Sequence, residues 1–206
     1  MKLEEMLVLS PKETLLLVID IQRDFLESEK GFAFHDAKND TTNMQRMVMH
    51  SLLPFINRSL EEEANVAYVK SEYPRGKFEE PYNTLCSELP GTDFYLIDIV
   101  TGNAKLKRIF TKLEHDPFTN PDLRKYIEEW KISNLILTGV TLTNCIKEAV
   151  QSAFLIPGLR IVVPEDCVSY RMARQLDAQE ILANYGYQEN KNVIVVNSNQ
   201  IRYKHG

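Results

Sequence analysis

The sequence predicts an α/β protein with an open, mostly parallel sheet and helices on both faces. Two observations support this prediction. Short apolar segments alternate with helical patterns along almost the whole chain. The apolar segments are also continuous rather than alternating, as in strands that are covered on both faces.

Composition and length limit the possible classes of protein. The 206 residues predict a single domain over 1–206, and 44% hydrophobic with 26% charged residues is ordinary for a globular protein. The net charge of −5 argues against a nucleic-acid-binding surface, and no apolar segment approaches the ~18 residues that span a bilayer. Three irregularly spaced cysteines fit neither a disulfide framework nor a zinc site, so we expect a cytoplasmic protein.

The first elements are a strand, a loop and a long helix. Thr14–Ile19 is a continuous apolar segment that Asp20 ends, so it predicts a central strand. Gln22–Asp40 is mixed in composition and predicts a loop. Asn43–Glu63 has apolar residues at helical spacing, and Pro54 inside it should kink or interrupt the helix.

The next segments predict two further strands around a second loop. Asn65–Val69 is a short apolar strand, and Ser71–Pro90 is rich in proline, glycine and charge, as in a long loop. Phe94–Val100 is apolar but ambiguous. Arg108–Thr111 predicts a third strand, which ends at Lys112.

A helix and a fourth strand follow. Asn120 suits an N-cap and Pro121 the first helical position, so a helix should run from there to about Lys131. Leu135–Leu137 then predicts a buried strand that stops at Gly139.

The remaining segments complete the alternation. After a five-residue turn, a helical pattern begins at Cys145. Arg160–Val163 predicts a fifth strand, Arg171–Tyr185 a helix ended by Gly186, and Val193–Val196 the last strand.

Cys145 is the first candidate for a nucleophile. At the first turn of a helix, backbone N–H groups are unpaired and the helix dipole is positive. This environment favours the thiolate and lowers a cysteine pKa below its ordinary value of about 8.5. The alternative is a buried cysteine that only packs.

Three chemically useful side chains each follow a predicted strand: Asp20, Lys112 and Cys145. The carboxyl ends of parallel strands meet at one edge of a sheet, so these side chains should lie together. Asp20 can act as a base and then an acid, Lys112 supplies positive charge, and the N–H groups of Thr141 and Cys145 can form an oxyanion hole. A structural Asp–Lys pair beside an inert cysteine is the alternative.

Four fragments carry a resemblance to a known family. They are Val18–Phe25 (Val-Ile-Asp-Ile-Gln-Arg-Asp-Phe), Pro90-Gly-Thr92, Lys112 followed by Asp116 and Phe118, and Gly139–Cys145 (Gly-Val-Thr-Leu-Thr-Asn-Cys). In order and spacing, over roughly Thr14–Val168, they resemble the isochorismatase-like cysteine hydrolase family. That family includes nicotinamidases, carbamoylsarcosine amidases and related ureido-amide hydrolases.

The resemblance implies a three-layer Rossmann-like fold and a catalytic triad of Asp20, Lys112 and Cys145. Our own expectation is an enzyme without a cofactor. The resemblance also implies a cis peptide between Val140 and Thr141, which aims the Thr141 N–H inward, and a homo-oligomer, a dimer or tetramer. The expected reaction cleaves a small amide, carbamoyl or ureido compound through a thioester on Cys145, which water then attacks with Asp20 as base.

The sequence departs from the family at two places. The metal-dependent nicotinamidase branch has Asp-x-His after the second strand, whereas this chain has Ser71-Glu72-Tyr73-Pro74, so we expect no metal and a substrate other than nicotinamide. The family's usual Thr-Asp near the nucleophile is Leu142-Thr143 here.

Several residues near the predicted site have less definite roles. His35 and His115 lie in predicted loops near this edge of the sheet, where each could contact substrate, and the favoured interpretation is a solvated or structural role. Cys86 and Cys167 match no catalytic position. The substrate pocket is predicted to involve Gln22, Phe25, Tyr73, Phe118 and Leu142.

Two other functions remain open on the sequence. An isochorismatase-type enzyme would cleave a vinyl ether using Asp20 and would tolerate Cys145→Ala. A catalytically silent family member would instead serve as a binding or oligomeric module, and the Leu142-Thr143 departure is its support.

Overall fold

A parallel sheet forms the middle layer of the computed structural model, which describes residues 6–27, 41–95, 108–186 and 193–205. Six strands follow the order β4-β3-β2-β5-β6-β8. The short strand β7 pairs with the last two residues of β5, after the part of β5 that pairs with β6. All of these pairings are parallel, which confirms the predicted sheet. The strands are β2 (Thr14–Ile19), β3 (Asn65–Ser71), β4 (Arg108–Lys112), β5 (Asn134–Val140), β6 (Arg160–Pro164), β7 (Val168–Ser169) and β8 (Val193–Val196).

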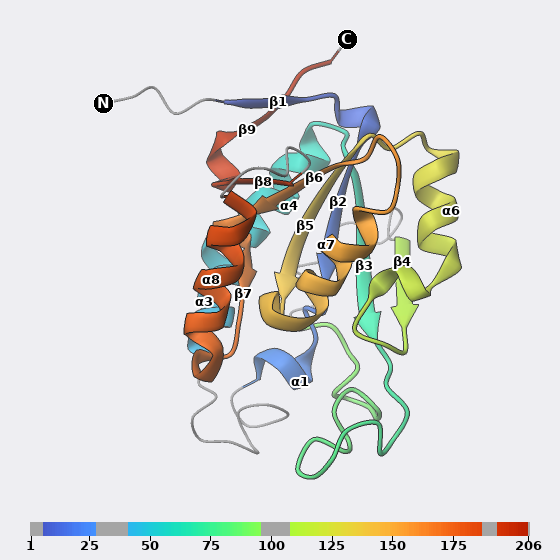
Figure 1. Ribbon diagram of the computed structural model, residues 1–206, viewed down its shortest axis with the longest axis vertical. Helices are drawn as coiled ribbons and strands as arrows, with labels where there is room; N and C mark the ends of the chain where they lie inside the picture. Colours follow the sequence, from blue (N-terminus) through green and yellow to red (C-terminus); the bar gives the residue numbers. More distant parts are fainter. Residues whose placement is uncertain (1–5, 28–40, 96–107, 187–192, 206) are drawn as a thin grey trace.

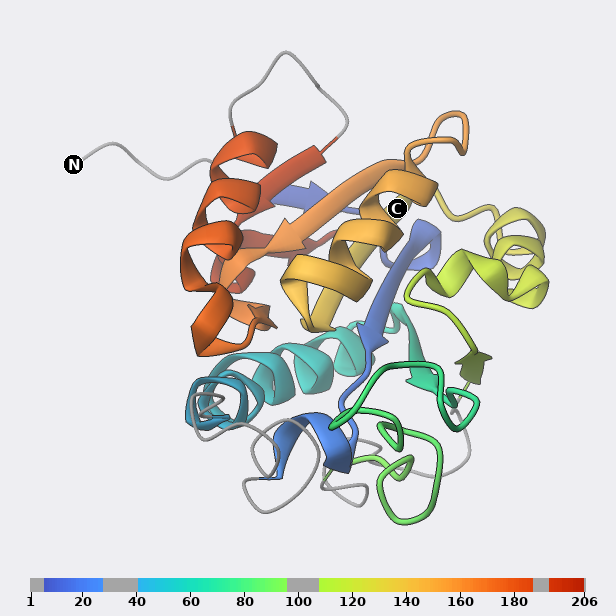
Figure 2. The ribbon, with the colours of Figure 1, turned by 60° about the horizontal axis from the view of Figure 1, so that its bottom comes forward.

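Helices cover both faces of this sheet (Figures 1 and 2). On one face lie α3 (Thr42–Met47), the π-helical turn Val48–Leu52 and α4 (Leu53–Glu61), and on the other α6 (Pro121–Glu129), α7 (Lys147–Ala153) and α8 (Gln175–Gly186). A short helix, α1 (Arg23–Leu26), follows β2. The predicted three-layer α/β fold is confirmed.

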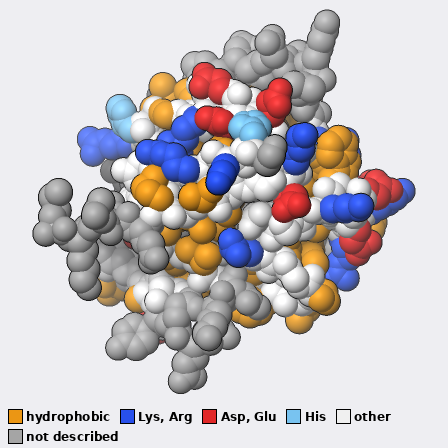
Figure 3. Space-filling model, turned by 90° about the horizontal axis from the view of Figure 1, so that it is seen from above, with side chains coloured by type: hydrophobic (Ala, Val, Ile, Leu, Met, Phe, Trp, Pro, Cys, Tyr) orange, Lys and Arg blue, Asp and Glu red, His pale blue; other side chains and the backbone are white. Residues whose placement is uncertain are grey.

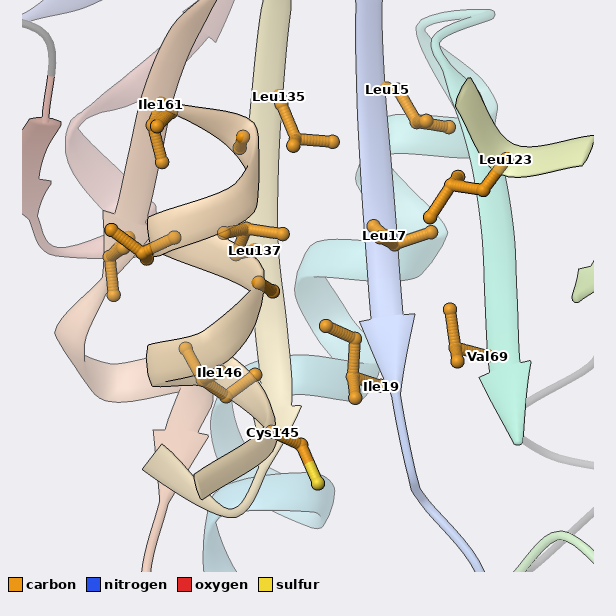
Figure 4. Packing of buried hydrophobic residues seen from close by; sticks show 14 of the residues in the cluster. Leu15, Leu17, Ile19, Val69, Leu123, Leu135, Leu137, Cys145, Ile146 and Ile161 are labelled. Atoms are coloured by element: carbon orange, nitrogen blue, oxygen red, sulfur yellow. The ribbon is translucent and has the colours of Figure 1, made fainter. Parts of the chain in front are cut away.

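The central strands are apolar throughout because each face is buried. In β2, Leu16 and Val18 pack into the cluster under α3 and α4. Leu15, Leu17 and Ile19 pack into the opposite cluster, part of which is shown in Figure 4. Every residue of β2 is buried, so the strand shows no polar alternation.

The long helix around Pro54 is irregular where the sequence predicts a kink. The chain stays helical from α3 to α4, but one turn before Pro54 it widens into the π-helical turn Val48–Leu52. Proline has no N–H, and its ring clashes with the carbonyl four residues earlier in a regular α-helix. The wider turn accommodates this change in the hydrogen-bond ladder.

Asn120 and Pro121 act at the start of α6 as predicted. The Asn120 side chain accepts a hydrogen bond from the N–H of Asp122, and Pro121 occupies the first helical position. The helix α6 ends at Glu129, two residues before the expected end.

The structure differs from the sequence prediction at several boundaries. A separate two-stranded parallel sheet of β1 (Leu7–Leu9) and β9 (Ile201–Tyr203) was not expected, nor was β7. Strands of two or three residues give too short a pattern to detect. The segment Arg171–Tyr185 starts as a 3₁₀ turn, Met172–Arg174, and only then becomes α8.

Other short 3₁₀ turns connect these elements. The turns are Pro11–Glu13, Pro117–Thr119, Glu165–Cys167 and Ser198–Gln200. Phe94 forms an isolated antiparallel bridge with Gln22, whereas most of the ambiguous segment after it is not described. His35 and most of the predicted loop around it also lie outside the described residues.

Gly139 does not end its strand. It pairs with Ile19 of β2 on one side and Val168 of β7 on the other, and β5 continues to Val140. Its φ of +108° lies in a region that side chains disfavour, and a Cβ built there would be 2.0 Å from the carbonyl oxygen of Ile19. The glycine therefore allows β5 to approach β2 just before the Cys145 turn.

Gly139→Ala is expected to lower the free energy of unfolding by about 3 kcal/mol or more. The alanine would strain the backbone at this positive φ, and its Cβ would also clash with the Ile19 carbonyl oxygen. Gly158→Ala is the matched control, because Gly158 has φ +78° but open space around its Cβ position. That control should cost about 1 kcal/mol from backbone strain alone. Urea unfolding of both variants tests this, and equal costs would show that the close approach to Ile19 is unimportant.

The carboxyl ends of the strands meet α1 and the loop 72–95 at one end of the molecule (Figure 1). The opposite end holds β1 and β9, and Figure 3 shows that face, with side chains of both charges and apolar ones between them. None of the described helices is both long and apolar enough to cross a membrane. A candidate site belongs at the end where the strands terminate.

Candidate active site

A buried ion pair between Asp20 and Lys112 forms the base of the site. The Lys112 Nζ lies 2.9 Å from Asp20 Oδ2, and neither side chain is exposed. Asp20 is the first residue after β2 and has φ +56°, whereas Lys112 is the last residue of β4. The two strands are not neighbours, because β3 lies between them.

Ser71, the last residue of β3, links the two charges. Lys112 Nζ donates to Ser71 Oγ at 2.7 Å, and Ser71 Oγ donates to Asp20 Oδ1 at 3.0 Å. Three adjacent strands therefore place their final side chains in one hydrogen-bonded set. The sequence prediction ended this strand at Val69 and placed Ser71 at the start of a loop, so Ser71 was left out of the site.

Lys112 also reaches the proposed nucleophile. Its Nζ lies 3.4 Å from Cys145 Sγ, 3.2 Å from the Tyr73 hydroxyl and 3.1 Å from the Glu114 carbonyl oxygen. Burial acts to lower the pKa of Lys112, but the Asp20 carboxylate and Cys145 raise it above its ordinary value. The ammonium therefore persists although it is buried.

Cys145 lies in a π-helical turn, Leu142–Ile146, between β5 and α7. Figure 4 shows its sulfur pointing from this turn toward the end of β2, near Ile19. Cys145 is packed at the edge of the hydrophobic cluster under α7 and also lines a cavity.

The expected low thiol pKa is wrong for the resting site. Burial and the nearby Asp20 carboxylate together raise the pKa of Cys145 to about 12, although Lys112 acts to lower it. Desolvation and an adjacent negative charge both disfavour the thiolate, and together they outweigh the pKa-lowering effect of the helix N-terminus. The thiol is protonated at neutral pH, so its attack requires a base.

The alkylation of Cys145 by limiting iodoacetamide is expected to rise about tenfold per pH unit between pH 7 and 10, without a plateau. The raised pKa leaves little thiolate below that value, and each pH unit increases it tenfold. Peptide mass spectrometry on native protein measures the rate at each cysteine. Cys86 and Cys167 are buried, have raised pKa values and do not line the described cavity, so they should react more slowly.

Two controls make this measurement decisive. In urea all three cysteines should react alike with an ordinary thiol pKa. Asp20→Asn should shift the native Cys145 profile to lower pH, since it removes a charge that raises the thiol pKa. A plateau below pH 8 in the unaltered protein would contradict the protonated thiol.

A cavity of about 190 Å³ opens beside Cys145. Its lining is mostly apolar and aromatic, with some polar side chains. The lining residues are Phe25, Tyr73, Phe78, Tyr82, Leu85, His115, Thr141, Asn144, Cys145 and Arg171. Phe25 and Tyr73 were predicted pocket residues, and both lie in this lining.

Gln22, Phe118 and Leu142 do not line the described cavity, contrary to the sequence prediction. The Gln22 amide is used internally: it accepts from the Ser71 N–H at 2.7 Å and donates to the carbonyl oxygens of Ser71 and Thr92. It therefore holds the loop after β3 against the start of α1.

The other two side chains belong to the hydrophobic core. Leu142 is fully buried in the cluster beneath α7, and Phe118 packs against the same cluster. An apolar side chain beside a nucleophile can face either the substrate or the core, and the sequence alone does not distinguish these directions.

His115 lies closer to the chemistry than its interpretation as a solvated or structural residue implied. Its Nδ1 is 3.7 Å from Cys145 Sγ and 3.3 Å from the Tyr73 hydroxyl, and its ring lines the cavity. His115 follows Lys112 by three residues, so its nearness to the same sheet edge was the available signal.

The predicted oxyanion-hole residues lie at the cavity wall. The peptide between Val140 and Thr141 is cis, and both Thr141 and Cys145 line the cavity. The Thr141 carbonyl accepts from the N–H groups of Asn144 and Ile146, which closes the turn that holds Cys145.

Within the described ranges, no three His, Cys, Asp or Glu side chains are grouped as metal ligands. Glu72, which follows β3, forms an ion pair with Lys70 instead.

Comparison with known proteins connects this geometry to a family. The model of the Isochorismatase domain matches residues 14–183. No curated protein matches the sequence. The structure is similar to a cysteine hydrolase from Pseudomonas syringae pv. phaseolicola, with 15% identity, a TM-score of 0.73 and coverage of 93% of this chain and 92% of that one.

Two further solved structures show the same fold. An isochorismatase-like hydrolase from Alkaliphilus metalliredigens is 17% identical, with a TM-score of 0.71 and coverage of 91% and 96% of the two chains. A pyrazinamidase/nicotinamidase from Streptococcus mutans is 17% identical, with a TM-score of 0.68 and coverage of 89% and 99%.

Proposed function

The chain belongs to the isochorismatase domain family of hydrolases, and on that premise we propose that it cleaves a C–N bond in a small amide, carbamoyl or ureido compound. The reaction proceeds through a thioester on Cys145. The observation that carries the proposal is the Lys112 ammonium, which is paired with buried Asp20 and lies 3.4 Å from a sulfur at the cavity wall.

In the first half of the reaction Cys145 attacks the substrate carbonyl. Asp20 takes the thiol proton as the S–C bond forms, so little free thiolate is needed, in accordance with the raised thiol pKa. The N–H groups of Thr141 and Cys145 stabilise the oxyanion. Asp20 then returns the proton to the leaving nitrogen as the C–N bond breaks.

Lys112 has an electrostatic role in this step. Its ammonium pairs with Asp20 and stabilises negative charge as it develops on the sulfur, because both groups lie within 3.4 Å of Nζ. Ser71 keeps the carboxylate and ammonium aligned through its hydroxyl. Water finally cleaves the thioester and releases the acid.

The cavity supports a small substrate. Its volume of about 190 Å³ and apolar lining suit a compact molecule with few polar groups beyond the bond that is cleaved. One of the similar structures is named for the hydrolysis of pyrazinamide and nicotinamide, which are small amides. That name supports the bond class, whereas Ser71-Glu72-Tyr73 without histidine supports a different substrate and a metal-free site.

The proposed function is tested with a panel of small amides, carbamoyl compounds and ureas, measuring release of ammonia or amine. We expect metal-chelated protein to hydrolyse at least one member of the panel. Turnover that disappears on chelation and returns with a divalent ion would contradict a metal-free reaction. Absence of C–N cleavage together with turnover of a vinyl ether would favour the isochorismatase-type alternative.

A further inference from the structure

We propose that His115 is the base that activates water for hydrolysis of the Cys145 thioester. This inference rests on the proposed function and deepens it, because it assigns the second half of the reaction to a residue outside the Asp20–Lys112–Cys145 set. It replaces the expectation that Asp20 serves as the base in both halves.

The position of His115 fits this role. Its Nδ1 lies 3.7 Å from Cys145 Sγ, and the acyl carbon of a thioester is bonded directly to that sulfur. A water molecule that donates a hydrogen bond to Nδ1 therefore lies near the acyl carbon, as base-assisted attack requires. The Tyr73 hydroxyl, 3.3 Å from Nδ1, borders the same space.

Access from the cavity also favours His115 over Asp20. Water enters from the cavity, and neither Asp20 nor Lys112 is among its lining residues. Both side chains are completely buried, and the Asp20 oxygens contact Ser71 Oγ and Lys112 Nζ. An acyl group on Cys145 would further separate them from solvent.

The other titratable groups of the described cavity wall are unsuitable bases. Arg171 offers a guanidinium group, which has hydrogen-bond donors but no acceptor. Burial raises the pKa of Tyr73, so its hydroxyl stays neutral and cannot act as a phenolate. Tyr82 offers only a phenol hydroxyl, and Cys145 itself carries the acyl group.

His115 is held in place and kept neutral. Its ring stacks on Phe78, with centroids 5.6 Å apart, and meets the Tyr73 ring edge-on. Burial lowers its pKa and Lys112 lowers it further, whereas the carboxylates of Asp20, Glu148 and Glu114 oppose this. The net direction is downward, so the imidazole has a free lone pair at neutral pH.

The step balances without any other reactant. The water oxygen bonds to the acyl carbon while one water proton moves to the His115 imidazole. The C–S bond then breaks, the electron pair returns to sulfur, and the thiolate takes the proton from the His115 imidazolium, which becomes neutral again. The products are the carboxylic acid and the original thiol, and no electrons are transferred.

The test uses p-nitrophenyl acetate, which acylates a thiol and requires no knowledge of the natural substrate. Release of p-nitrophenol reports acetylation, and peptide mass spectrometry follows the acetyl group on Cys145. In His115→Gln we expect acetylation within about twofold of the unaltered rate, but deacetylation slowed by about 100-fold. Acetyl-Cys145 should therefore accumulate.

Two further variants separate catalysis from packing. His115→Phe keeps a ring against Phe78 but has no base, so it should accumulate acetyl-Cys145 like His115→Gln. His50→Gln is the matched control, because His50 is exposed on the turn between α3 and α4, and it should leave both rates unchanged.

Each outcome bears on the proposal. Deacetylation at the unaltered rate in both His115 variants overturns it, as does equal slowing of both steps, which indicates that His115 only positions Cys145. Failure of the unaltered protein to form acetyl-Cys145 would contradict the thioester itself and hence the proposed function as well. Normal acetylation with normal deacetylation in the variants contradicts the His115 role alone.

Discussion

Cys145→Ala is expected to lower kcat for any amide substrate by at least about 10⁴-fold, because no other described cavity residue offers a thiol nucleophile. The variant should remain folded, since alanine fits where a slightly larger buried side chain was removed. Release of ammonia or amine measures the loss, and thermal unfolding checks that the fold is retained.

Cys167→Ala is the matched control for this substitution. Cys167 is also a buried, free cysteine, but it packs in the cluster on the opposite face of the sheet. It should retain normal kcat. Amide hydrolysis that persists in Cys145→Ala would disprove the thioester mechanism.

The same variant distinguishes the two alternative functions. An isochorismatase-type activity would survive Cys145→Ala and disappear in Asp20→Asn, because only the carboxyl group acts there. A binding module would show no turnover in either variant or in the unaltered protein. The predicted homo-oligomer remains a prediction that sedimentation of the unaltered protein can check.

Lys112→Met is expected to destabilise the fold by about 3–5 kcal/mol in addition to abolishing activity. Methionine approximates the shape of the lysine stem but leaves the Asp20 carboxylate fully buried without its cation. The same change removes the donor to Ser71, Tyr73 and the Glu114 carbonyl. Urea unfolding at neutral pH measures the cost.

A double variant isolates the uncompensated charge. Adding Asp20→Asn to Lys112→Met removes the buried negative charge, so it should recover about 2 kcal/mol relative to Lys112→Met alone. A cost that the second substitution leaves unchanged or increases would show that the charge is not the cause.

Lys125→Met provides the exposed counterpart. Lys125 pairs with Glu129 at 3.7 Å on the surface of α6, and both side chains are more than half exposed. Solvent screens this pair, so its loss should cost less than about 0.5 kcal/mol. Similar costs for Lys112→Met and Lys125→Met would contradict the importance of burial.

The sequence determined the central elements because local pattern and burial agree there. Thr14–Ile19 is predicted and observed with identical bounds, since a strand covered on both faces must be apolar throughout. The alternation of strands and helices then required a parallel sheet, whose carboxyl ends had to bring Asp20, Lys112 and Cys145 to one edge. Their adjacency follows from topology and needs no side-chain detail.

Tertiary packing alone decided the chemical state of these residues. The thiol pKa of Cys145 depends on complete burial and on Asp20, which lies 125 positions earlier in the chain. The position of Cys145 at the start of a helix therefore predicted the wrong direction for this pKa shift. The roles of Ser71 and His115 likewise depend on contacts across separate strands and loops.

Side-chain direction was the other feature that required the structure. Gln22 binds the backbone of the loop after β3 and Leu142 turns into the core, whereas Phe25 and Tyr73 face the cavity. Local sequence specifies backbone periodicity through short-range sterics and burial. Desolvation, charge coupling and side-chain direction near an irregular turn depend on atoms distant in sequence, so the tertiary structure determined them.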